Sequence, residues 1–310
     1  MSRRAVRSAL VGAAVARIAY GALRARPPAG EPAWSRTNHR GEPVTLLAGP
    51  ALAIGGIAAT VTGSASPRNR LAAVLAGAGA AAFGGYDDLA GDRSATGFRG
   101  HLGALGHGQI TTGAVKLAGI GATAVAAALV AKGPPGSRPA RPADLLLGAG
   151  LVAGGANLVN LFDLRPGRAV KAAVLGAAVL CAAPGGAAAA TPALSAAVAL
   201  LPDDLGERAM LGDAGANSLG AMLGVAAATT LPRRGQAAAL AAIVALTAAS
   251  EFVSFTELIE RTGPLRWLDL LGRRPAEQSA ATGQPMAGEH DGDPGASDEA
   301  FGASPLAPVR

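Results

Sequence analysis

The sequence predicts an all-α fold, a polytopic membrane helix bundle of about nine transmembrane helices with room for a tenth. Half of the 310 residues are hydrophobic, only 15% are charged, and 3% are aromatic. Several long stretches contain no Asp, Glu, Lys or Arg, and each approaches the roughly 20 residues that a membrane-crossing helix needs. The charge-free stretches lie between residues 42 and 68, 144 and 163, 171 and 203, and 213 and 233.

These stretches and the shorter apolar runs beside them predict nine helices. The stretch 171–203 is long enough for two short helices hinged at Pro184-Gly185-Gly186, a turn-forming sequence. The first helix is interrupted by Arg17, and its basic start also resembles a signal peptide. The predicted helices span 6–24, 45–63, 69–85, 110–131, 143–162, 168–183, 188–202, 214–231 and 235–253.

An alanine-rich soluble helical protein is the alternative fold class. Such a protein should carry polar residues at every third or fourth position, and segment 172–202 has no such stripe. The chain divides into a transmembrane domain at 1–253, an amphipathic interfacial segment at 254–275 and a tail at 276–310. The tail is rich in Gly, Pro, Ser, Asp and Glu, so it is predicted to be disordered.

The net charge of +6 raises the question of nucleic-acid binding. The Lys and Arg residues are scattered in short clusters between apolar runs, without a basic helix, so we expect no nucleic-acid partner. Anionic lipid headgroups or phosphate-bearing substrates fit this distribution better. The single cysteine, Cys181, excludes a disulfide framework within the chain.

Polar residues gather on one face of the predicted bundle. If the N-terminus is outside, the inside segments are 25–44, 86–109, 163–167, 203–213 and the tail. About 14 Lys and Arg residues fall on this side and about 10 on the other, a weak bias of the sign that the positive-inside rule expects. Carboxylates and amides also converge there, which is typical of an enzyme working at that face. A transporter would instead place polar groups near the bilayer midplane.

Four clusters provide the chemistry of this face. Asp87 and Asp88 would repel each other at a helix end unless a cation or a proton relieved them. Asn157 and Asn160 share a helix face with Asp163, and amides in a membrane helix are costly unless they line a polar site. The other two clusters are 97–101, which ends at His101 and leads to Lys116, and 210–218, which contains Asp213 and Asn217.

Simpler explanations stay open for each cluster taken alone, such as solvated loop acids at 87–88 or a snorkelling Lys116. Together, carboxylates and amides without thiols favour a hard, oxygen-ligated cation such as Mg²⁺. Zinc is disfavoured because the four histidines do not pair at zinc spacing. No Walker motif or glycine-rich dinucleotide loop is present, which argues against an ATPase or a Rossmann enzyme.

In this order along the chain, the clusters resemble the polyprenyl-phosphate N-acetylhexosamine-1-phosphate transferases. That family includes phospho-MurNAc-pentapeptide translocase and the GlcNAc-1-phosphate transferases of surface polysaccharides. Tyr86-Asp87-Asp88 resembles the family's aspartate pair, and Asn157-x-x-Asn160-Leu161-x-Asp163 resembles its Asn-x-x-Asn-Leu-x-Asp-Gly segment. Gly212-Asp213-x-Gly215 resembles its Gly-Asp-x-Gly segment, and Lys116 falls near its helix-four lysine. The resemblance spans roughly residues 36–275.

The resemblance implies a Mg²⁺-dependent phosphoglycosyl transferase of the plasma (inner) membrane, with its active site facing the cytoplasm. Such an enzyme moves a sugar-1-phosphate, typically of an N-acetylhexosamine, from a UDP-sugar to undecaprenyl or another polyprenyl phosphate and releases UMP. The products serve the synthesis of peptidoglycan and other cell-envelope polysaccharides. A homodimer is compatible with this assignment.

The resemblance also implies roles for individual residues. Asp213, with Asp88, would coordinate Mg²⁺ on the nucleotide diphosphate. Asp87 or Asp88 would orient or deprotonate the lipid phosphate, and Lys116 would offset phosphate charge. The residues expected to bind the donor are Asn157, Asn160, Asp163, Arg165, Asn217 and His101.

Two departures from the family pattern concern donor recognition. Leu164-Arg165-Pro166-Gly167 stands where the family has its second aspartate, and 251–257 replaces its histidine-rich loop. We expect Arg165 and Arg168 to supply replacement phosphate contacts, and retained activity in the double alanine variant would contradict this. The departures leave two alternatives open: an unusual nucleotide donor, or a non-catalytic membrane scaffold or lipid-binding relative of the same fold.

Overall fold

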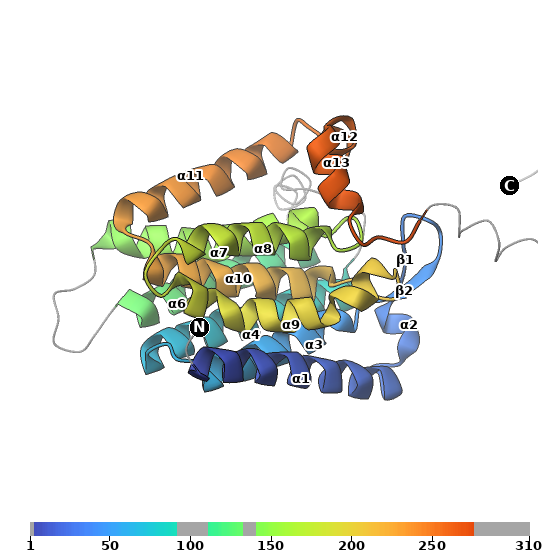
Figure 1. Ribbon diagram of the computed structural model, residues 1–310, viewed down its shortest axis with the longest axis horizontal. Coiled ribbons are helices and arrows are strands. Elements are labelled where there is room, and N and C mark those ends of the chain that lie inside the picture. Colours follow the sequence, from blue (N-terminus) through green and yellow to red (C-terminus); the bar gives the residue numbers. More distant parts are fainter. Residues whose placement is uncertain (1–2, 92–110, 133–140, 276–310) are drawn as a thin grey trace, which may run out of the picture. The chain divides into compact units, whose positions relative to one another are not determined.

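Helices account for most of the chain that the structure, a computed structural model, describes: residues 3–91, 111–132 and 141–275. Twelve helices and one two-stranded hairpin lie in these ranges (Figure 1). The helices are α1 (Arg3–Ala25), α2 (Glu31–Trp34), α3 (Ala48–Thr62), α4 (Pro67–Ala90), α6 (Thr112–Lys132), α7 (Pro142–Phe162), α8 (Arg168–Cys181), α9 (Gly186–Leu205), α10 (Gly212–Thr230), α11 (Arg233–Ser250), α12 (Phe255–Arg261) and α13 (Gly263–Leu270). The antiparallel hairpin joins β1 (Ser35–Thr37) to β2 (Pro43–Thr45).

Each of the nine predicted ranges contains a helix: α1, α3, α4 and α6 to α11. The predicted break within 171–203 is confirmed, because α8 ends at Cys181 and α9 begins at Gly186. Gly185 caps α9 with φ +79°, a left-handed conformation that glycine adopts without steric cost. α4 continues to Ala90, five residues beyond its predicted end at 85, so the aspartate pair lies in its last turn.

Three of these helices, α1, α6 and α7, are long and apolar enough to cross a membrane. A fourth candidate is the pair α11 and α12, which is bent by 96° at the break between them. Among the described residues these helices support membrane association, and α3 is a shorter apolar helix. The other predicted spans are not confirmed, and two of them correspond to short helices, α3 with 15 residues and α8 with 14.

Helix α10 lies at the centre of the bundle and packs against α3, α4, α7 and α9 (Figure 1). Every residue of α10 from Ala214 to Ala228 is buried. Small residues permit this close packing, because two facing glycines let the α7 and α10 backbones touch. A Cβ added to Gly220 would lie 2.1 Å from the carbonyl oxygen of Gly155.

We therefore expect Gly220→Ala to destabilise the bundle by about 1–3 kcal/mol, because neither backbone can yield without moving a whole helix. The matched control is Gly121→Ala in α6, where an added Cβ meets no atom within 4 Å. That control should be neutral or stabilising by up to about 1 kcal/mol, since alanine favours the helix over glycine. Thermal unfolding of both variants in detergent tests the difference, and equal melting temperatures would contradict it.

Two short helices, α12 and α13, occupy most of the segment 254–275 that was predicted to be amphipathic. The segment is tied to the bundle through Asp269, which is buried, while Trp267 and Leu265 are exposed. The tail 276–310, predicted to be disordered, lies outside the described residues, as does His101.

Candidate active site

Three helix ends meet at one end of the bundle and bring together residues that are far apart in sequence. Asp87 comes from the last turn of α4, Lys116 from the start of α6, and Asp213 from the first turn of α10. Lys116 Nζ lies 2.6 Å from Asp87 Oδ2 and 2.6 Å from Asp213 Oδ2. Three predicted site residues therefore form one ion cluster, with the ammonium group between two carboxylates.

Asp88 has a different set of partners from its neighbour Asp87. Its Oδ1 accepts the backbone N–H of Asp213 at 3.0 Å, and its Oδ2 accepts that of Ala214 at 2.9 Å. A carboxylate in this position satisfies N–H groups at the start of α10 and interacts favourably with the positive end of the helix dipole. The two adjacent carboxylates thus face separate positive groups, which relieves the repulsion expected from the sequence.

Glycines allow α4 and α10 to approach closely enough for these contacts. A Cβ on Gly84 would lie 2.3 Å from the carbonyl oxygen of Asp213. Gly212 has φ +59°, and a Cβ there would lie 3.0 Å from Asp88 Oδ2. The guanidinium of Arg36, from β1, donates a hydrogen bond to the backbone oxygen of Asp88 and attaches the hairpin to the same helix end.

Two carboxylates of the cluster, Asp87 and Asp213, are candidate ligands of Mg²⁺. Among the described residues, no group of three or more His, Cys, Asp or Glu side chains is arranged to hold a metal ion unaided. Asp87 and Asp213 nevertheless direct one oxygen each at a common point, where the Lys116 ammonium provides the positive charge. Proteins commonly bind Mg²⁺ through one or two carboxylates, with substrate phosphates and water completing its shell. Asp88, which was expected to hold the metal with Asp213, instead accepts a backbone N–H group with each of its oxygens, so Asp87 and Asp213 are the carboxylates that could hold Mg²⁺ together with a phosphate-bearing substrate.

A polar cavity of about 220 Å³ lies beside the loop that follows α7. Its walls include Asp163 and Arg165, two of the residues expected to bind the donor, together with Asn38, His39 and Glu207. Asp163 is only 8% exposed, and this burial raises the pKa of its carboxyl well above its ordinary value. The nearby carboxyl of Asp204 raises that pKa further.

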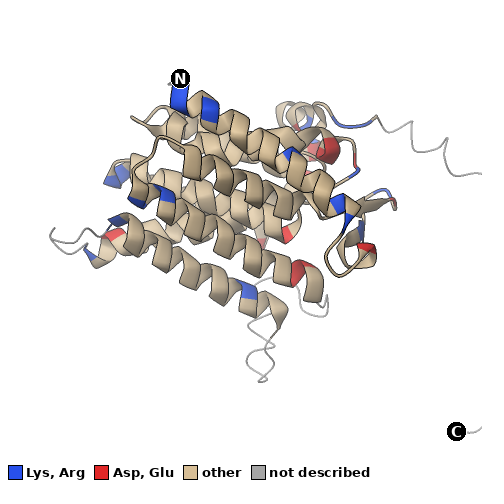
Figure 2. Cartoon of the chain, turned by 90° about the horizontal axis from the view of Figure 1, so that it is seen from below, with Lys and Arg blue, Asp and Glu red and all other residues tan. Residues whose placement is uncertain are grey.

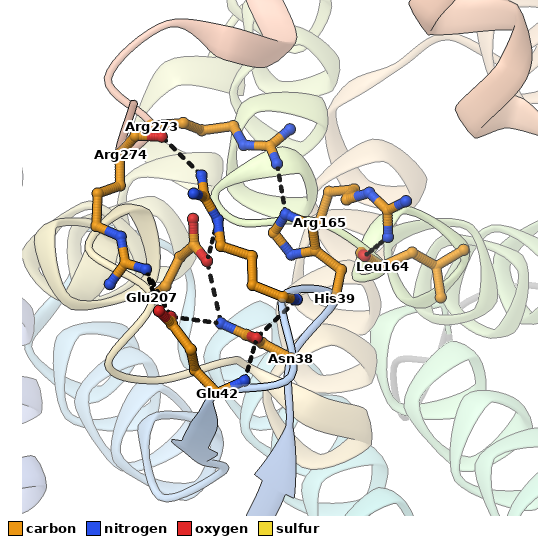
Figure 3. Close-up of polar contacts among 9 residues, drawn as sticks. Asn38, His39, Glu42, Leu164, Arg165, Glu207, Arg273 and Arg274 are labelled. Atoms are coloured by element: carbon orange, nitrogen blue, oxygen red, sulfur yellow. Dashed lines mark hydrogen bonds and ion pairs between the residues drawn. The ribbon is translucent and has the colours of Figure 1, made fainter. Parts of the chain in front are cut away.

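A network of ion pairs and hydrogen bonds borders this cavity (Figure 3). Asn38 Nδ2 donates to Glu207 Oε2 at 3.0 Å and to Glu42 Oε2 at 3.3 Å. Arg274 Nη2 contacts both oxygens of Glu42, at 2.5 and 2.6 Å, and Arg40 Nε lies 3.0 Å from Glu207 Oε2. The network joins the β1–β2 hairpin, the turn after α9 and the segment that follows α13.

The remaining predicted donor residues lie apart from this cavity or have other partners. Asn217 is 2% exposed, and its Nδ2 donates to the Asp213 backbone oxygen at 2.7 Å, inside α10. Asn157 Nδ2 lies 3.4 Å from Thr247 Oγ1, so it links α7 to α11. Asn160 is half-buried near the end of α7, and its backbone oxygen accepts the N–H of Asp163.

Arg168, which was expected to contact phosphate, is instead part of a buried ion pair. Its Nε lies 2.8 Å from Asp269 Oδ1, its Nη2 lies 3.2 Å from Asp269 Oδ2, and its side chain is 6% exposed. Nη1 donates to Thr256 Oγ1 at 3.0 Å, and Arg273 also pairs with Asp269, at 2.7 Å. Arg168 therefore anchors α12 and α13 to α8, and Arg165 alone of the expected pair lines the polar cavity.

An apolar groove of about 250 Å³ lies between α8, α11, α12 and α13. Phe162 and Phe255 stack at its edge with ring centroids 5.3 Å apart. Leu175, Leu246 and Leu258 contribute to its apolar wall. Arg168, Lys171 and Asp269 line the same groove, and because Arg168 is paired with Asp269, Lys171 provides its net positive charge.

Sequence reasoning did not single out Asp204, Glu207, Arg36 or the arginines at 273–274. The run Pro202-Asp203-Asp204-Leu205-Gly206-Glu207-Arg208 did carry a signal, because it places three acids within five residues of a segment predicted to lie on the polar face. Arg36 and Arg274 gave no comparable signal, since their partners are 52 and 232 residues away. Arg273 pairs with Asp269 only four residues away, a spacing that the sequence does show. No protein-family model matches this chain, and no curated protein shows significant similarity to it.

Proposed function

We propose that this protein transfers a sugar-1-phosphate, most simply that of an N-acetylhexosamine, from a UDP-sugar to undecaprenyl or another polyprenyl phosphate. The observation that supports this most directly is the convergence of Asp87, Lys116 and Asp213 within 2.6 Å contacts at one end of an apolar helix bundle. Two carboxylates and one ammonium suit a reaction between phosphate groups, which needs charge control and no covalent nucleophile.

The proposed reaction joins an oxygen of the lipid phosphate to the sugar-linked β-phosphorus of the donor. The bond from that phosphorus to the bridging oxygen breaks, and UMP leaves with the bonding electron pair. Asp87 orients the acceptor phosphate and takes its proton if one is present, and Lys116 neutralises phosphate charge. Asp88 acts as a positioning residue, because both of its oxygens hold the start of α10 and thereby fix Asp213. Rate enhancement then comes from placement and electrostatics.

Bound at Asp213 and Asp87, Mg²⁺ would supply positive charge to the donor diphosphate. The polar cavity beside Asp163 is the proposed donor site, with Arg165 as a cation for phosphate and Asn38 as an amide partner. The apolar groove between α8 and α12 is the proposed seat of the first isoprene units of the acceptor. Lys171 lines that groove and favours an anionic lipid there, whereas the charge of Arg168 is balanced by Asp269.

The proposal includes a topology of nine crossings in the plasma membrane, with the N-terminus outside and the ion cluster at the cytoplasmic face. Three helices and one bent pair support membrane crossings by length and composition. The polar end of the bundle contains the hairpin, the ion cluster and the network of Figure 3. A donor made in the cytoplasm would reach this end directly.

A transfer assay tests the proposal. Purified full-length protein in detergent is given Mg²⁺, undecaprenyl phosphate and a panel of radiolabelled UDP-sugars, and label in the lipid phase is counted. We expect transfer from at least one donor and loss of that transfer in Asp213→Asn. The matched control is Asp144→Asn, which should retain activity. Asp144 lies at the other end of the bundle, where its carboxylate pairs with Arg233 at 2.9 Å.

The alternative function is a non-catalytic scaffold or lipid-binding protein of the same fold. It is favoured by the replacement of the histidine-rich loop and by the pairing of Arg168 with Asp269 where a phosphate contact was expected. No transfer from any donor, by folded protein that still binds undecaprenyl phosphate, would favour this alternative over the enzyme.

A further inference from the structure

A second polar cavity, of about 290 Å³, lies at the end of the bundle opposite the ion cluster. It is enclosed by the end of α3, the start of α4, the start of α9 and the end of α10. In α4, Arg70 lines this cavity and Asp87 belongs to the ion cluster; 17 residues of helix separate them, or about 25 Å. The polar side chains in its wall are Thr60, Ser64, Asn69, Arg70, Thr229 and Thr230.

Arg70 is held in place by one of its own hydrogen bonds and keeps donors to spare. Its Nη1 donates to the backbone oxygen of Val61 at 2.7 Å, which fixes the half-buried guanidinium at the end of α3. A guanidinium has five N–H donors in a planar fork that matches phosphate oxygens. Within the described part of the chain, the side chains of Ser64 and Asn69 have no hydrogen-bond partner, so they are available to a ligand.

The start of α9 adds a further group suited to an anion. Its N-cap is Gly185, which lines the cavity and has no side chain to accept from the first-turn N–H groups. Unsatisfied N–H groups at a helix start attract negative charge. The threonines behave differently, because Thr60, Thr229 and Thr230 donate to carbonyl oxygens of their own helices. Their hydroxyl oxygens form a polar wall without negative charge.

The charge of this end of the bundle points in the same direction (Figure 2). Among the described residues it holds nine cations and a single acid, Asp144, whereas acids and cations are mixed at the end with the ion cluster. The cations are Arg3, Arg4, Arg7, Arg68, Arg70, Lys132, Arg141, Arg233 and Arg234. An end of this charge attracts anionic lipid headgroups.

We propose that this cavity is a binding site for the phosphate headgroup of an anionic membrane lipid, with Arg70 as its main ligand and Asn69 and Ser64 as further donors. The location fits this occupant under the proposed topology, on which the site rests, because the ends of α3, α4, α9 and α10 then lie at the level of the headgroups. The remaining wall is made of small and apolar residues, including Met222, Val225 and Ala226, which suit the glycerol and upper acyl groups of a lipid better than a hydrated free ion. This site is independent of the proposed transfer reaction.

Thermal unfolding of the purified full-length chain tests the site. The protein in detergent is titrated with phosphatidylglycerol, with phosphatidylcholine and with inorganic phosphate. We expect phosphatidylglycerol to raise the melting temperature saturably, and Arg70→Gln to raise the half-saturating lipid concentration about tenfold, as loss of a charge-assisted hydrogen bond predicts. Arg68→Gln is the matched control, because Arg68 belongs to the same helix turn but does not line the cavity, and it should change that concentration less than about twofold.

Ser64→Glu is a second variant, chosen because Ser64 is exposed and tolerates substitution without cost to the fold. A carboxylate at the mouth of the cavity should also raise the half-saturating concentration about tenfold. If Arg70→Gln and Arg68→Gln raised the half-saturating lipid concentration equally, the lipid would be attracted by diffuse surface charge, and the proposed site would be wrong. If phosphatidylcholine raised the melting temperature as much as phosphatidylglycerol, or if inorganic phosphate alone gave the full increase, the ligand would not be an anionic lipid.

Discussion

Asp87→Asn is expected to lower the rate of sugar-phosphate transfer by about 10²–10³-fold, the usual effect of removing one preorganised electrostatic group from an active site. The expectation rests on the contact of Asp87 Oδ2 with Lys116 Nζ, at the point where the phosphates are proposed to meet. The fold should change little, because Lys116 keeps Asp213 as a partner at 2.6 Å. The melting temperature of Asp87→Asn should therefore remain close to that of the wild type.

Asp88→Asn is the informative comparison, since it makes the same chemical change one residue along the chain. Both Asp88 oxygens accept N–H groups at the start of α10, so its loss should lower stability by about 1–2 kcal/mol, as for other helix caps. Single-turnover transfer and thermal unfolding, measured on both variants, separate the two roles. A stable, inactive Asp88→Asn beside an active Asp87→Asn would show that the roles are assigned the wrong way round.

Arg168→Ala is expected to destabilise the protein by about 2–3 kcal/mol, because the buried carboxylate of Asp269 loses its charge-assisted hydrogen bonds to Arg168 and keeps its pairing with Arg273. Both side chains of this pair are less than a tenth exposed, and the pair links α8 to α13. Chemical denaturation in detergent measures the loss. The double variant Arg168→Ala with Asp269→Ala should lose less stability than the sum of the two single losses, because the two residues share one ion pair.

The control for this prediction is Arg165→Ala, three residues earlier. Arg165 is half-buried, and within the described residues its guanidinium donates to the carbonyl oxygen of its neighbour Leu164 alone, so its removal should change stability by less than about 0.5 kcal/mol. Under the proposed function, however, it should raise the KM for the donor. If Arg165→Ala and Arg168→Ala were equally stable, the anchoring role of Arg168 would be contradicted.

The same ion pair predicts a dependence of stability on pH. Burial alone would raise the pKa of Asp269, but its hydrogen bonds and charge interactions with Arg168 outweigh burial and hold that pKa below its ordinary value. A carboxyl with a lowered pKa stabilises the folded state above its unfolded pKa, near 4. That stabilisation is lost as the pH falls through the lowered pKa. The difference in stability between wild type and Asp269→Ala should therefore shrink in strong acid.

The sequence predicted the positions of the helices well because the signals for them are local. A charge-free run of sufficient length, ended by Gly or Pro, defines a helix without reference to the rest of the chain, and Pro184-Gly185-Gly186 separates α8 from α9 for the same reason. The end of α4 was predicted five residues too early, at residue 85. Gly84, near that point, lies inside the helix and permits the close contact of α4 with α10, which only packing reveals.

The sequence by itself determined the helical class, the gathering of carboxylates and amides toward one end, and the choice of Asp87, Lys116 and Asp213 as candidates. Composition and spacing carry that information, because the apolar or polar nature of a local run of residues does not depend on how the helices pack. Only the tertiary structure decided the partner of each side chain. It gave Asp87 and Asp88 different partners and placed the Asn217 side chain inside α10. It also paired Arg168 with Asp269, 101 residues away. Such pairings depend on the rotation and separation of packed helices, and glycine contacts of a few ångströms between distant segments set both.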